Sequence, residues 1–284
     1  MISGVLLRPA NPKAVVQRNS ATAVPKEFYK HIAQYLAENN CACFYFDYRG
    51  IGESSPHEGL KGCKYEITDW AKQDMNVVLK FLKNKFNDIP LYFLYHSVGG
   101  QLIGMVPEIN EINGILAIAT SSGYAKNMTF SGWFQSFYFF RIVRPCIHLF
   151  YGYSKFKFLG IMEDLSIRVT NRWHEWCRRK TSFFDAKNAK KIENLDRFKT
   201  LKMPVKVAIA TDDSICSIIN TEIFWKNVYS HGGIHINWLK PEYFNLKAIG
   251  HFDFSRKTSK DKLWPWALTR LEQFNKAKHP LKNE

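Results

Sequence analysis

The stretch Leu91–Gly100, with the sequence LYFLYHSVGG, constrains the fold of this chain more than any other. Its first five residues predict a buried strand, and the segment after the two glycines predicts a helix. A serine on such a strand-to-helix turn exposes its hydroxyl at the carboxyl edge of a sheet, and the next amide, that of Val98, points to the same place. The residues after the serine must be small because the helix leaves at once. The stretch therefore predicts a nucleophile elbow with Ser97 at its tip.

Strands and helices alternate along most of the chain, which is typical of a parallel sheet covered by helices on both faces. Apolar runs bounded by turn residues predict strands at Gly4–Leu7, Ala14–Arg18, Cys41–Phe46, Leu91–Tyr95, Ile115–Ala119, Val205–Ala210 and Asn245–Ile249. Periodic apolar positions predict helices after Pro25, from a cap at Thr68 or Asp69 to about Phe86, over Ser217–Tyr229 and over Lys262–Ala277. The sequence therefore predicts an α/β fold with a mostly parallel sheet.

Three of the predicted strand ends carry residue types that act together in nucleophilic catalysis. Ser97 follows one strand, Asp212 and Asp213 follow another, and His251 follows the last. In such a set the histidine takes the proton from the serine, and an aspartate fixes the imidazole tautomer. The chain order Ser, Asp, His is that of the α/β-hydrolases. Adjacent residues leaving a strand tend to face opposite sides, so we expect only one of the two aspartates to reach His251.

The alternation stops in residues 124–201, which are aromatic and basic and lack β periodicity. They contain WFQSFYFF and RWHEWCRRK, which predict helices inserted into the sheet domain as a lid over Ser97. We therefore expect residues 1–123 to form the first part of an α/β core, residues 124–201 a helical lid, and residues 202–284 the second part of the core.

Aromatic residues are concentrated in the predicted lid. We expect Trp133, Phe134, Phe137 and Trp173 to be among its apolar residues, and an aromatic stripe of this kind usually forms the core of a helical segment. Tyr124, Trp133 and Phe137 are also the candidates for lining a substrate pocket.

The net charge of +15 comes from 40 Lys and Arg against 25 Asp and Glu. Residues 124–200 hold fifteen of the basic and six of the acidic residues, and thus nine of the excess positive charges. The charge is not gathered in a tail or on one helix face, which argues against nucleic acid as a partner. A solvated surface or attraction to an anionic small-molecule substrate accounts better for it.

Six scattered cysteines form no CxxC pair, and the Cys41/Cys43 spacing places two on one strand face as buried thiols. Metal-ligand spacing is absent among the other histidines, which are His31, His57, His148, His174, His231 and His235. We therefore expect no metal and no cofactor. His96 is expected to pack or hydrogen-bond near the elbow.

No apolar run is long enough for a membrane helix, and the first residues lack a secretory pattern, so we expect a cytoplasmic protein. The sequence does not predict an oligomeric state.

Several stretches resemble a known family. They are NSATAVPKEFY, FDYRGIGES, HSVGGQ, SSGY, GYSKFKFLG, RWHEWCRR, DDSI, AIGHFDFSR and LWPW, and they span most of residues 14–270. On these motifs the chain resembles the α/β-hydrolase superfamily and, within it, the uncharacterised predicted hydrolases of the serine-aminopeptidase-like (S33-type) branch. The resemblance implies a Ser-His-Asp serine hydrolase that cleaves an ester, thioester or amide bond through an acyl-enzyme.

The resemblance also implies roles for single residues. In related hydrolases the acid turn commonly reads G-x-x-D-x-[IV], which assigns the catalytic acid to Asp213. The oxyanion hole would use the N–H of Val98 and a second amide in the loop where relatives carry His-Gly. Asn19-Ser20 matches that pair here, which makes Ala21 a better second donor than Thr22.

Two departures from the family pattern stand out. Tyr95 replaces the elbow glycine, so we expect it to crowd the packing behind Ser97 and expect Tyr95→Gly to be tolerated for folding. Such folds also open with two antiparallel strands, whereas only Gly4–Leu7 is available here, so we expect the N-terminal antiparallel strands to be incomplete. Two alternatives therefore stay open: an acyltransferase that uses the same triad, and a catalytically weak, hydrolase-like binding protein.

Overall fold

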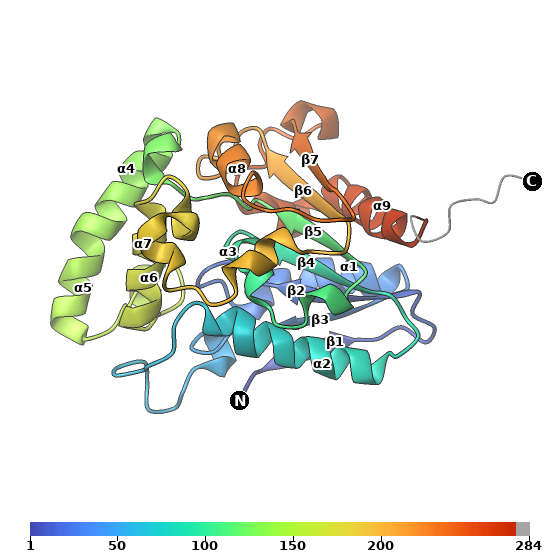
Figure 1. Ribbon diagram of the computed structural model, residues 1–284, viewed down its shortest axis with the longest axis horizontal. Helices are drawn as coiled ribbons and strands as arrows, with labels where there is room; N and C mark the ends of the chain where they lie inside the picture. The colour runs from blue at the N-terminus through green and yellow to red at the C-terminus, as the bar shows by residue number, and fades with distance from the viewer. Residues whose placement is uncertain (277–284) are drawn as a thin grey trace, which may run out of the picture.

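The computed structural model describes residues 1–276 and contains a seven-stranded sheet in the order β1-β3-β2-β4-β5-β6-β7 (Figure 1). Its strands are β1 (Gly4–Leu7), β2 (Ala14–Asn19), β3 (Cys41–Phe46), β4 (Leu91–His96), β5 (Gly114–Ile118), β6 (Val205–Ala210) and β7 (Ile234–Leu239). β1 pairs antiparallel with β3, and the other pairs are parallel. The predicted α/β-hydrolase fold with a mostly parallel sheet is confirmed, and within the described sheet antiparallel pairing is confined to β1 at one edge.

The central strand β4 lies between β2 and β5, and the register brings their carboxyl ends level. Asn19 at the end of β2 pairs with Tyr95, and His96 at the end of β4 pairs with Ile118 at the end of β5. Because parallel strands end at the same edge of the sheet, the residues that follow these three strands meet there.

Helices cover both faces of the sheet. Those of the sheet domain are α1 (Lys30–Glu38), α2 (Asn76–Lys85), α3 (Val98–Gln101), α8 (Ile218–Trp225) and α9 (Leu263–Lys276). α1 contacts β3 and α9, and α9 contacts β5, whereas α2 packs against β2 from the other face (Figure 1). The predicted helices are therefore present close to their predicted bounds, and Ala277, the predicted end of the last one, lies outside the described residues.

Short 3-10 segments join these elements. They are Lys26–Tyr29, Gly52–Ser54, Ile103–Met105, Ile109–Glu111, Ala125–Asn127, Lys157–Leu159, Ser182–Phe184, Leu195–Lys199, Pro241–Phe244, Asp253–Ser255 and Lys257–Ser259.

A run of helices separates β5 from β6. It contains α4 (Phe130–Tyr138), a π-helical turn (Phe139–Val143), α5 (Arg144–Tyr151), α6 (Ile167–Cys177) and α7 (Ala186–Ala189). These helices lie together beyond one end of the sheet, at the left in Figure 1. The helical character predicted for this stretch agrees with the structure, and the stretch adds no strand to the sheet.

The predicted last strand is wrong. Asn245–Ile249 is not a strand, and the last strand is β7, over Ile234–Leu239. Among the residues that the structure describes, β7 pairs with β6 alone, and most of its residues are half-buried or exposed. An edge strand of this kind carries polar residues such as His235 and Asn237 in its sequence, so it lacks the continuous apolar run by which the buried strands are recognised.

Asp69 occupies one of the two cap positions predicted for the helix before β4. The helix begins at Trp70 with a π turn that continues into α2, and the side chain of Asp69 does not cap it. Asp69 instead accepts the N–H of Glu66. The buried carboxylate of Asp74 accepts the N–H and the guanidinium of Arg49, so this ion pair fixes the first turns of the helix.

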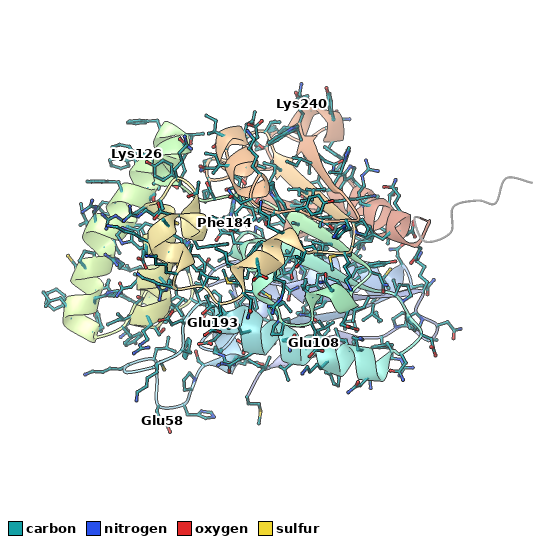
Figure 2. The ribbon with its side chains drawn as sticks, viewed as in Figure 1. Glu58, Glu108, Lys126, Phe184, Glu193 and Lys240 are labelled. Atoms are coloured by element: carbon teal, nitrogen blue, oxygen red, sulfur yellow. The ribbon has the colours of Figure 1, made fainter. Side chains whose placement is uncertain are left out.

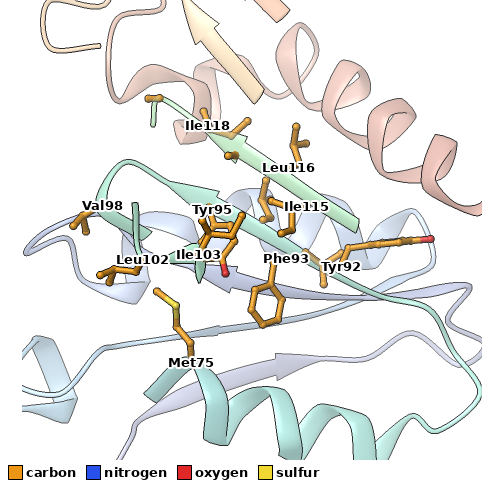
Figure 3. Packing of buried hydrophobic residues seen from close by; sticks show 14 of the residues in the cluster. Met75, Tyr92, Phe93, Tyr95, Val98, Leu102, Ile103, Ile115, Leu116 and Ile118 are labelled. Atoms are coloured by element: carbon orange, nitrogen blue, oxygen red, sulfur yellow. The ribbon is translucent and has the colours of Figure 1, made fainter. Parts of the chain in front are cut away.

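The core lies on both sides of the central strands. All six residues of β4 are buried, and Phe93 and Tyr95 belong to one apolar cluster with Met75, Leu102 and residues of β5 (Figure 3). Burial of both faces is what requires β4 to be apolar throughout, and it holds the carboxyl end of this strand in a fixed position.

Charged side chains occupy the outside of the molecule. Glu108 and Glu193, labelled in Figure 2, form surface ion pairs with Lys80 and Lys72. Exposed pairs of this type contribute about 0–1 kcal/mol each, so they contribute little to the stability of the fold. Within residues 1–276, no helix combines the length and the apolarity needed to cross a bilayer.

Candidate active site

Ser97 lies at the tight turn between β4 and α3. Its backbone angles, φ 52° and ψ −119°, are rare for a residue with a side chain and cost about 1–3 kcal/mol. The turn also requires its two glycines. A Cβ on Gly99 would lie 2.8 Å from the carbonyl oxygen of Ser20, and one on Gly100 would collide with the side chain of Thr120. The close approach of these neighbours explains the sequence Ser-Val-Gly-Gly.

Three side chains from separate strand ends form a hydrogen-bonded chain. Ser97 Oγ lies 3.0 Å from His251 Nε2, and His251 Nδ1 lies 2.8 Å from Asp213 Oδ2. An ionised carboxylate can only accept, so Nδ1 carries the ring proton and Nε2 accepts the hydroxyl proton of Ser97. His251 and Asp213 are buried, and Ser97 is half-buried. The structure therefore brings together the three residues that the sequence singled out, in the tautomer that proton abstraction requires.

Asp213 is held as a carboxylate. Burial alone would raise its pKa, but the electrostatic interaction with His251, the hydrogen bond from its ring and the N–H groups of Cys216 and Ile215 outweigh burial and leave the pKa below the usual value. Asp213 Oδ1 accepts those two amides at 2.9 and 2.8 Å, which leaves Oδ2 for His251.

Asp212 points to a different part of the site. Its two oxygens accept the N–H groups of Ile249 (2.9 Å) and Gly250 (3.1 Å), directly before His251. This side chain therefore bonds to the loop that carries the histidine. Asp213 therefore faces the imidazole, and Asp212 fixes the backbone that carries it.

A buried hydrogen-bond network through His96 connects the backbone of His251 to Tyr29. The Nε2 of His96 lies 2.8 Å from the carbonyl oxygen of His251, and its Nδ1 lies 2.9 Å from Tyr29 Oη. A carbonyl only accepts, so His96 Nε2 carries the ring proton and Nδ1 accepts the proton of Tyr29. Burial, with the charges of His251 and Arg18 adding to it, lowers the pKa of His96 well below its usual value, so this ring is neutral.

Tyr29 also contacts the predicted oxyanion loop. Burial raises its pKa to about 12, and its oxygen accepts the N–H of Ala21 at 2.9 Å. The guanidinium of buried Arg18 lies 3.9 Å from the centre of the Tyr29 ring. The sequence analysis missed Tyr29 because its partners His96 and Ala21 come from other segments, although it lies within the stretch NSATAVPKEFY that carries the family resemblance.

The two predicted oxyanion donors, the N–H groups of Val98 and Ala21, differ in whether a protein group already accepts their hydrogen bond. Val98 contributes the first N–H of α3, and the first N–H groups of a helix have no partner within the helix. The N–H of Ala21 is already bonded to Tyr29 Oη. A substrate oxygen would therefore meet one unpaired amide, and a second amide that must be shared with or released from Tyr29.

The predicted pocket residues Tyr124, Trp133 and Phe137 do not join this network. Trp133 and Phe137 stack on each other along α4, with ring centres 5.7 Å apart, and are 37% and 46% exposed. Phe134, at 56% exposed, lies on the same helix. The expectation that this aromatic stripe forms a buried core is therefore wrong for Trp133, Phe134 and Phe137. Trp173 packs on Phe139 and Phe140.

One cluster could in principle offer ligand atoms to a metal. Asp213, Cys216 and His251 place one such atom each within 4.8 Å of one another. The chemistry of these donors fits hydrogen bonding better, because His251 and Asp213 bond to each other and Cys216 Sγ donates to the carbonyl oxygen of Ala119. Burial raises the pKa of Cys216 well above its usual value, so this group is a thiol and not the thiolate that binds metal.

Tyr95, in the place of the elbow glycine, is fully buried in the apolar cluster, and its ring meets Phe93 edge-on at 5.4 Å (Figure 3). Its hydroxyl has no protein partner in the described part of the chain. The elbow thus forms with a tyrosine at this position, and the burial of its ring in the core argues against the tolerance of Tyr95→Gly that the family pattern suggests.

Tyr95→Gly is expected to lower the free energy of unfolding by about 3–5 kcal/mol, because it empties a packed site in β4. Tyr95→Phe should raise it by about 1 kcal/mol, because it removes a buried hydroxyl that lacks a partner. Chemical denaturation of both variants measures the two effects. A stable Tyr95→Gly protein with raised activity would show that crowding of the elbow, and not core packing, dominates at this position.

Comparisons with known proteins were made for the whole chain. The family model described as "Serine aminopeptidase, S33" matches residues 10–238. A search of curated proteins gave no match.

Solved structures give the same fold. A soluble variant of monoglyceride lipase from Saccharomyces cerevisiae, in complex with a substrate analogue, is 17% identical over 96% of this chain and 92% of its own, with a TM-score of 0.67. A monoacylglycerol lipase from Paleococcus ferrophilus is 12% identical over 96% of this chain and 99% of its own, with a TM-score of 0.60. Est1E from Butyrivibrio proteoclasticus, with bound ferulic acid, is 13% identical over 95% and 96%, with a TM-score of 0.56. At these identities the likeness is one of fold.

Proposed function

The chain belongs to the serine aminopeptidase S33 family of α/β-hydrolases, and from that membership we propose that it is a serine hydrolase acting on a small acyl substrate. The scissile bond would be that of an ester, thioester or amide. The observation that carries the proposal is the hydrogen-bonded chain from Asp213 through His251 to Ser97, at 2.8 and 3.0 Å. Monoacylglycerol and monoglyceride lipases are among the structures of the same fold, which favours an ester.

In the proposed mechanism, Ser97 Oγ attacks the acyl carbon while His251 Nε2 takes the hydroxyl proton. The bond from Oγ to the acyl carbon forms, the bond to the leaving group breaks, and the leaving group takes the proton from His251. Water then attacks the acyl-enzyme, with His251 as its base, and releases the acid. Asp213 holds the tautomer and stabilises the imidazolium.

The proposed oxyanion hole consists of the N–H groups of Val98 and Ala21. Val98 is supported by its position as the first amide of α3, next to the nucleophile. For Ala21 the proposal requires that the developing oxyanion competes with Tyr29 Oη for the same N–H. A charged oxygen is the stronger acceptor, so the competition favours the transition state.

We also propose that residues 124–201 act as a lid between the two core parts, residues 1–123 and 202–284. The excess of positive charge in residues 124–200 would attract anionic acyl substrates. The six cysteines are all free, as a reducing compartment would keep them, which supports a cytoplasmic location.

The proposed attraction has a measurable consequence. The ratio of kcat/KM for an ester with a carboxylate on its acyl chain to that for a neutral ester of equal length is expected to exceed one. This ratio should fall toward one as NaCl is raised, because salt screens charge over a Debye length of about 10 Å at 0.1 M. A ratio that stays constant with salt would show that the charge is only a solvated surface.

A fluorophosphonate probe tests the proposed nucleophile. The native protein should be labelled at Ser97, Ser97→Ala should not be labelled, and Ser214→Ala, a change on the acid loop, should be labelled like the native protein. The labelled protein is then tested against p-nitrophenyl esters, with and without an added alcohol. Absence of labelling on the folded native protein would support a binding protein, and transfer of the acyl group to the alcohol in preference to water would support an acyltransferase.

A further inference from the structure

A hollow of about 500 Å³ lies between the segment around α5 and the helix α6, and its lining contains none of Ser97, Asp213 and His251. Its polar lining residues are Arg141, Arg144, Asn171, His174, Glu175 and Arg178. We call it the arginine hollow. Sites for small ligands commonly span about 300–1,000 Å³, so it can hold a charged group with a small attached body.

The three arginines have few protein partners. Within residues 1–276 no carboxylate oxygen lies within 4.0 Å of a side-chain nitrogen of Arg141, Arg144 or Arg178. The ion pairs of α6 and the residues after it use Arg172, Arg179 and Lys191 instead. Glu175, the acidic residue of the lining, bonds to Arg172 at 3.0 Å and to Lys191 at 2.7 Å. Its negative charge is therefore already matched by two cations.

Arg144 is held in place by neutral acceptors. Its Nε donates to the carbonyl oxygen of Phe140 at 3.3 Å, and its Nη1 donates to Asn171 Oδ1 at 2.7 Å. These bonds fix the guanidinium without neutralising it. In the described chain the other amino group, Nη2, has no acceptor, so the hollow contains an oriented donor.

The positive charges act on one another. Burial, and then the charges of Arg141 and Arg178, lower the pKa of Arg144. Burial and the same three guanidiniums lower the pKa of His174 to about 4. His174, stacked on Phe140 with ring centres 4.6 Å apart, is thus neutral at pH 7 and adds a hydrogen-bonding ring without a further charge. An anion in the hollow would relieve the repulsion.

We propose that the arginine hollow is a binding site for a phosphate group, separate from the hydrolase chemistry. Three guanidiniums exceed what a single carboxylate needs, and their planar forks match the oxygens of a phosphate monoester. The group can come from a soluble phosphorylated compound or from a phospholipid headgroup. The same helical run also exposes the apolar residues Ile142, Leu149 and Phe150, which is the kind of surface that a lipid source requires. Both sources are therefore included in the test.

The test uses the full chain and its Ser97→Ala variant, so that its outcome does not depend on turnover. Calorimetric titration with inorganic phosphate, against chloride at equal ionic strength, should show saturable binding. Arg178→Gln should weaken this binding by about tenfold or more, because it removes a charged donor. Arg168→Gln is the matched control, since Arg168 lies on α6, the helix that ends directly before Arg178, but bonds to the carbonyl oxygen of Lys64. It should bind phosphate like the parent protein.

A second measurement guards against misfolding. Without phosphate, Arg178→Gln should unfold at the same temperature as the parent protein or a higher one, because a repelling charge is gone. Vesicles of phosphatidylcholine with and without phosphatidic acid identify the source. If the protein binds the vesicles with phosphatidic acid and not those without it, and if this binding depends on Arg178, the group is a lipid headgroup. Equal losses in Arg178→Gln and Arg168→Gln, or no Arg178-dependent binding of either probe, would overturn the proposal.

Discussion

His251→Ala is expected to lower kcat toward p-nitrophenyl esters by about a million-fold, the size of effect seen when a triad histidine is removed from a serine protease. His251 Nε2 is the group that lies 3.0 Å from Ser97 Oγ, so without the ring the hydroxyl keeps its proton and remains a weak nucleophile. The fold should survive, because Asp213 keeps its bonds to the amides of Ile215 and Cys216.

The control for this prediction is another histidine. His235→Ala changes an exposed residue of the edge strand β7 and should leave kcat unchanged. Steady-state rates of both variants, with circular dichroism to show that each is folded, make the measurement. If His251→Ala hydrolyses esters at close to the native rate, the proposed role of this histidine is wrong.

The sequence predicted six of the seven strands, and the places of Ser97 and Asp213, for one physical reason. Buried parallel strands are continuous apolar runs, and the residues that directly follow them meet at one edge. Ser97 and Asp213 each follow such a run within three residues, and their meeting therefore depends on strand positions that the sequence contains.

Contacts between loops are harder to predict, because they depend on distances that no local pattern encodes. The sequence places His251 at the end of a strand that the structure does not contain. His251 instead reaches Ser97 from a loop twelve residues beyond the end of β7, and Asp212 holds this loop. The bond from Tyr29 Oη to His96 joins residues 67 positions apart. The exposed face of α4 is predicted wrongly as a core because an aromatic stripe shows the same helical spacing whether it is buried or faces solvent.

The adjacent aspartates offer the sharpest comparison, because each variant to asparagine removes one charge and keeps the shape. Asp213→Asn is expected to lower kcat by about 10⁴, as in a serine protease, because the amide can present its NH₂ to His251 Nδ1 and stabilise the wrong tautomer. The imidazole then offers a proton to Ser97, where an acceptor is needed. Binding of an uncharged ester should change little, so the loss should appear in kcat and not in KM.

Asp212→Asn is expected to act on the fold more than on the chemistry. The amide oxygen of the asparagine can still accept one backbone N–H, but its NH₂ group must face the second backbone N–H, and both of these groups are donors. One of the two bonds to Ile249 and Gly250 is therefore lost. Loss of a charged hydrogen bond costs about 1.5–3 kcal/mol, which thermal unfolding should detect. We expect kcat to fall by about tenfold at most, because Asp213 still orients the ring. If Asp212→Asn instead abolishes turnover while Asp213→Asn retains it, the acid that serves His251 in the working enzyme is Asp212, and the loop must rearrange when substrate binds.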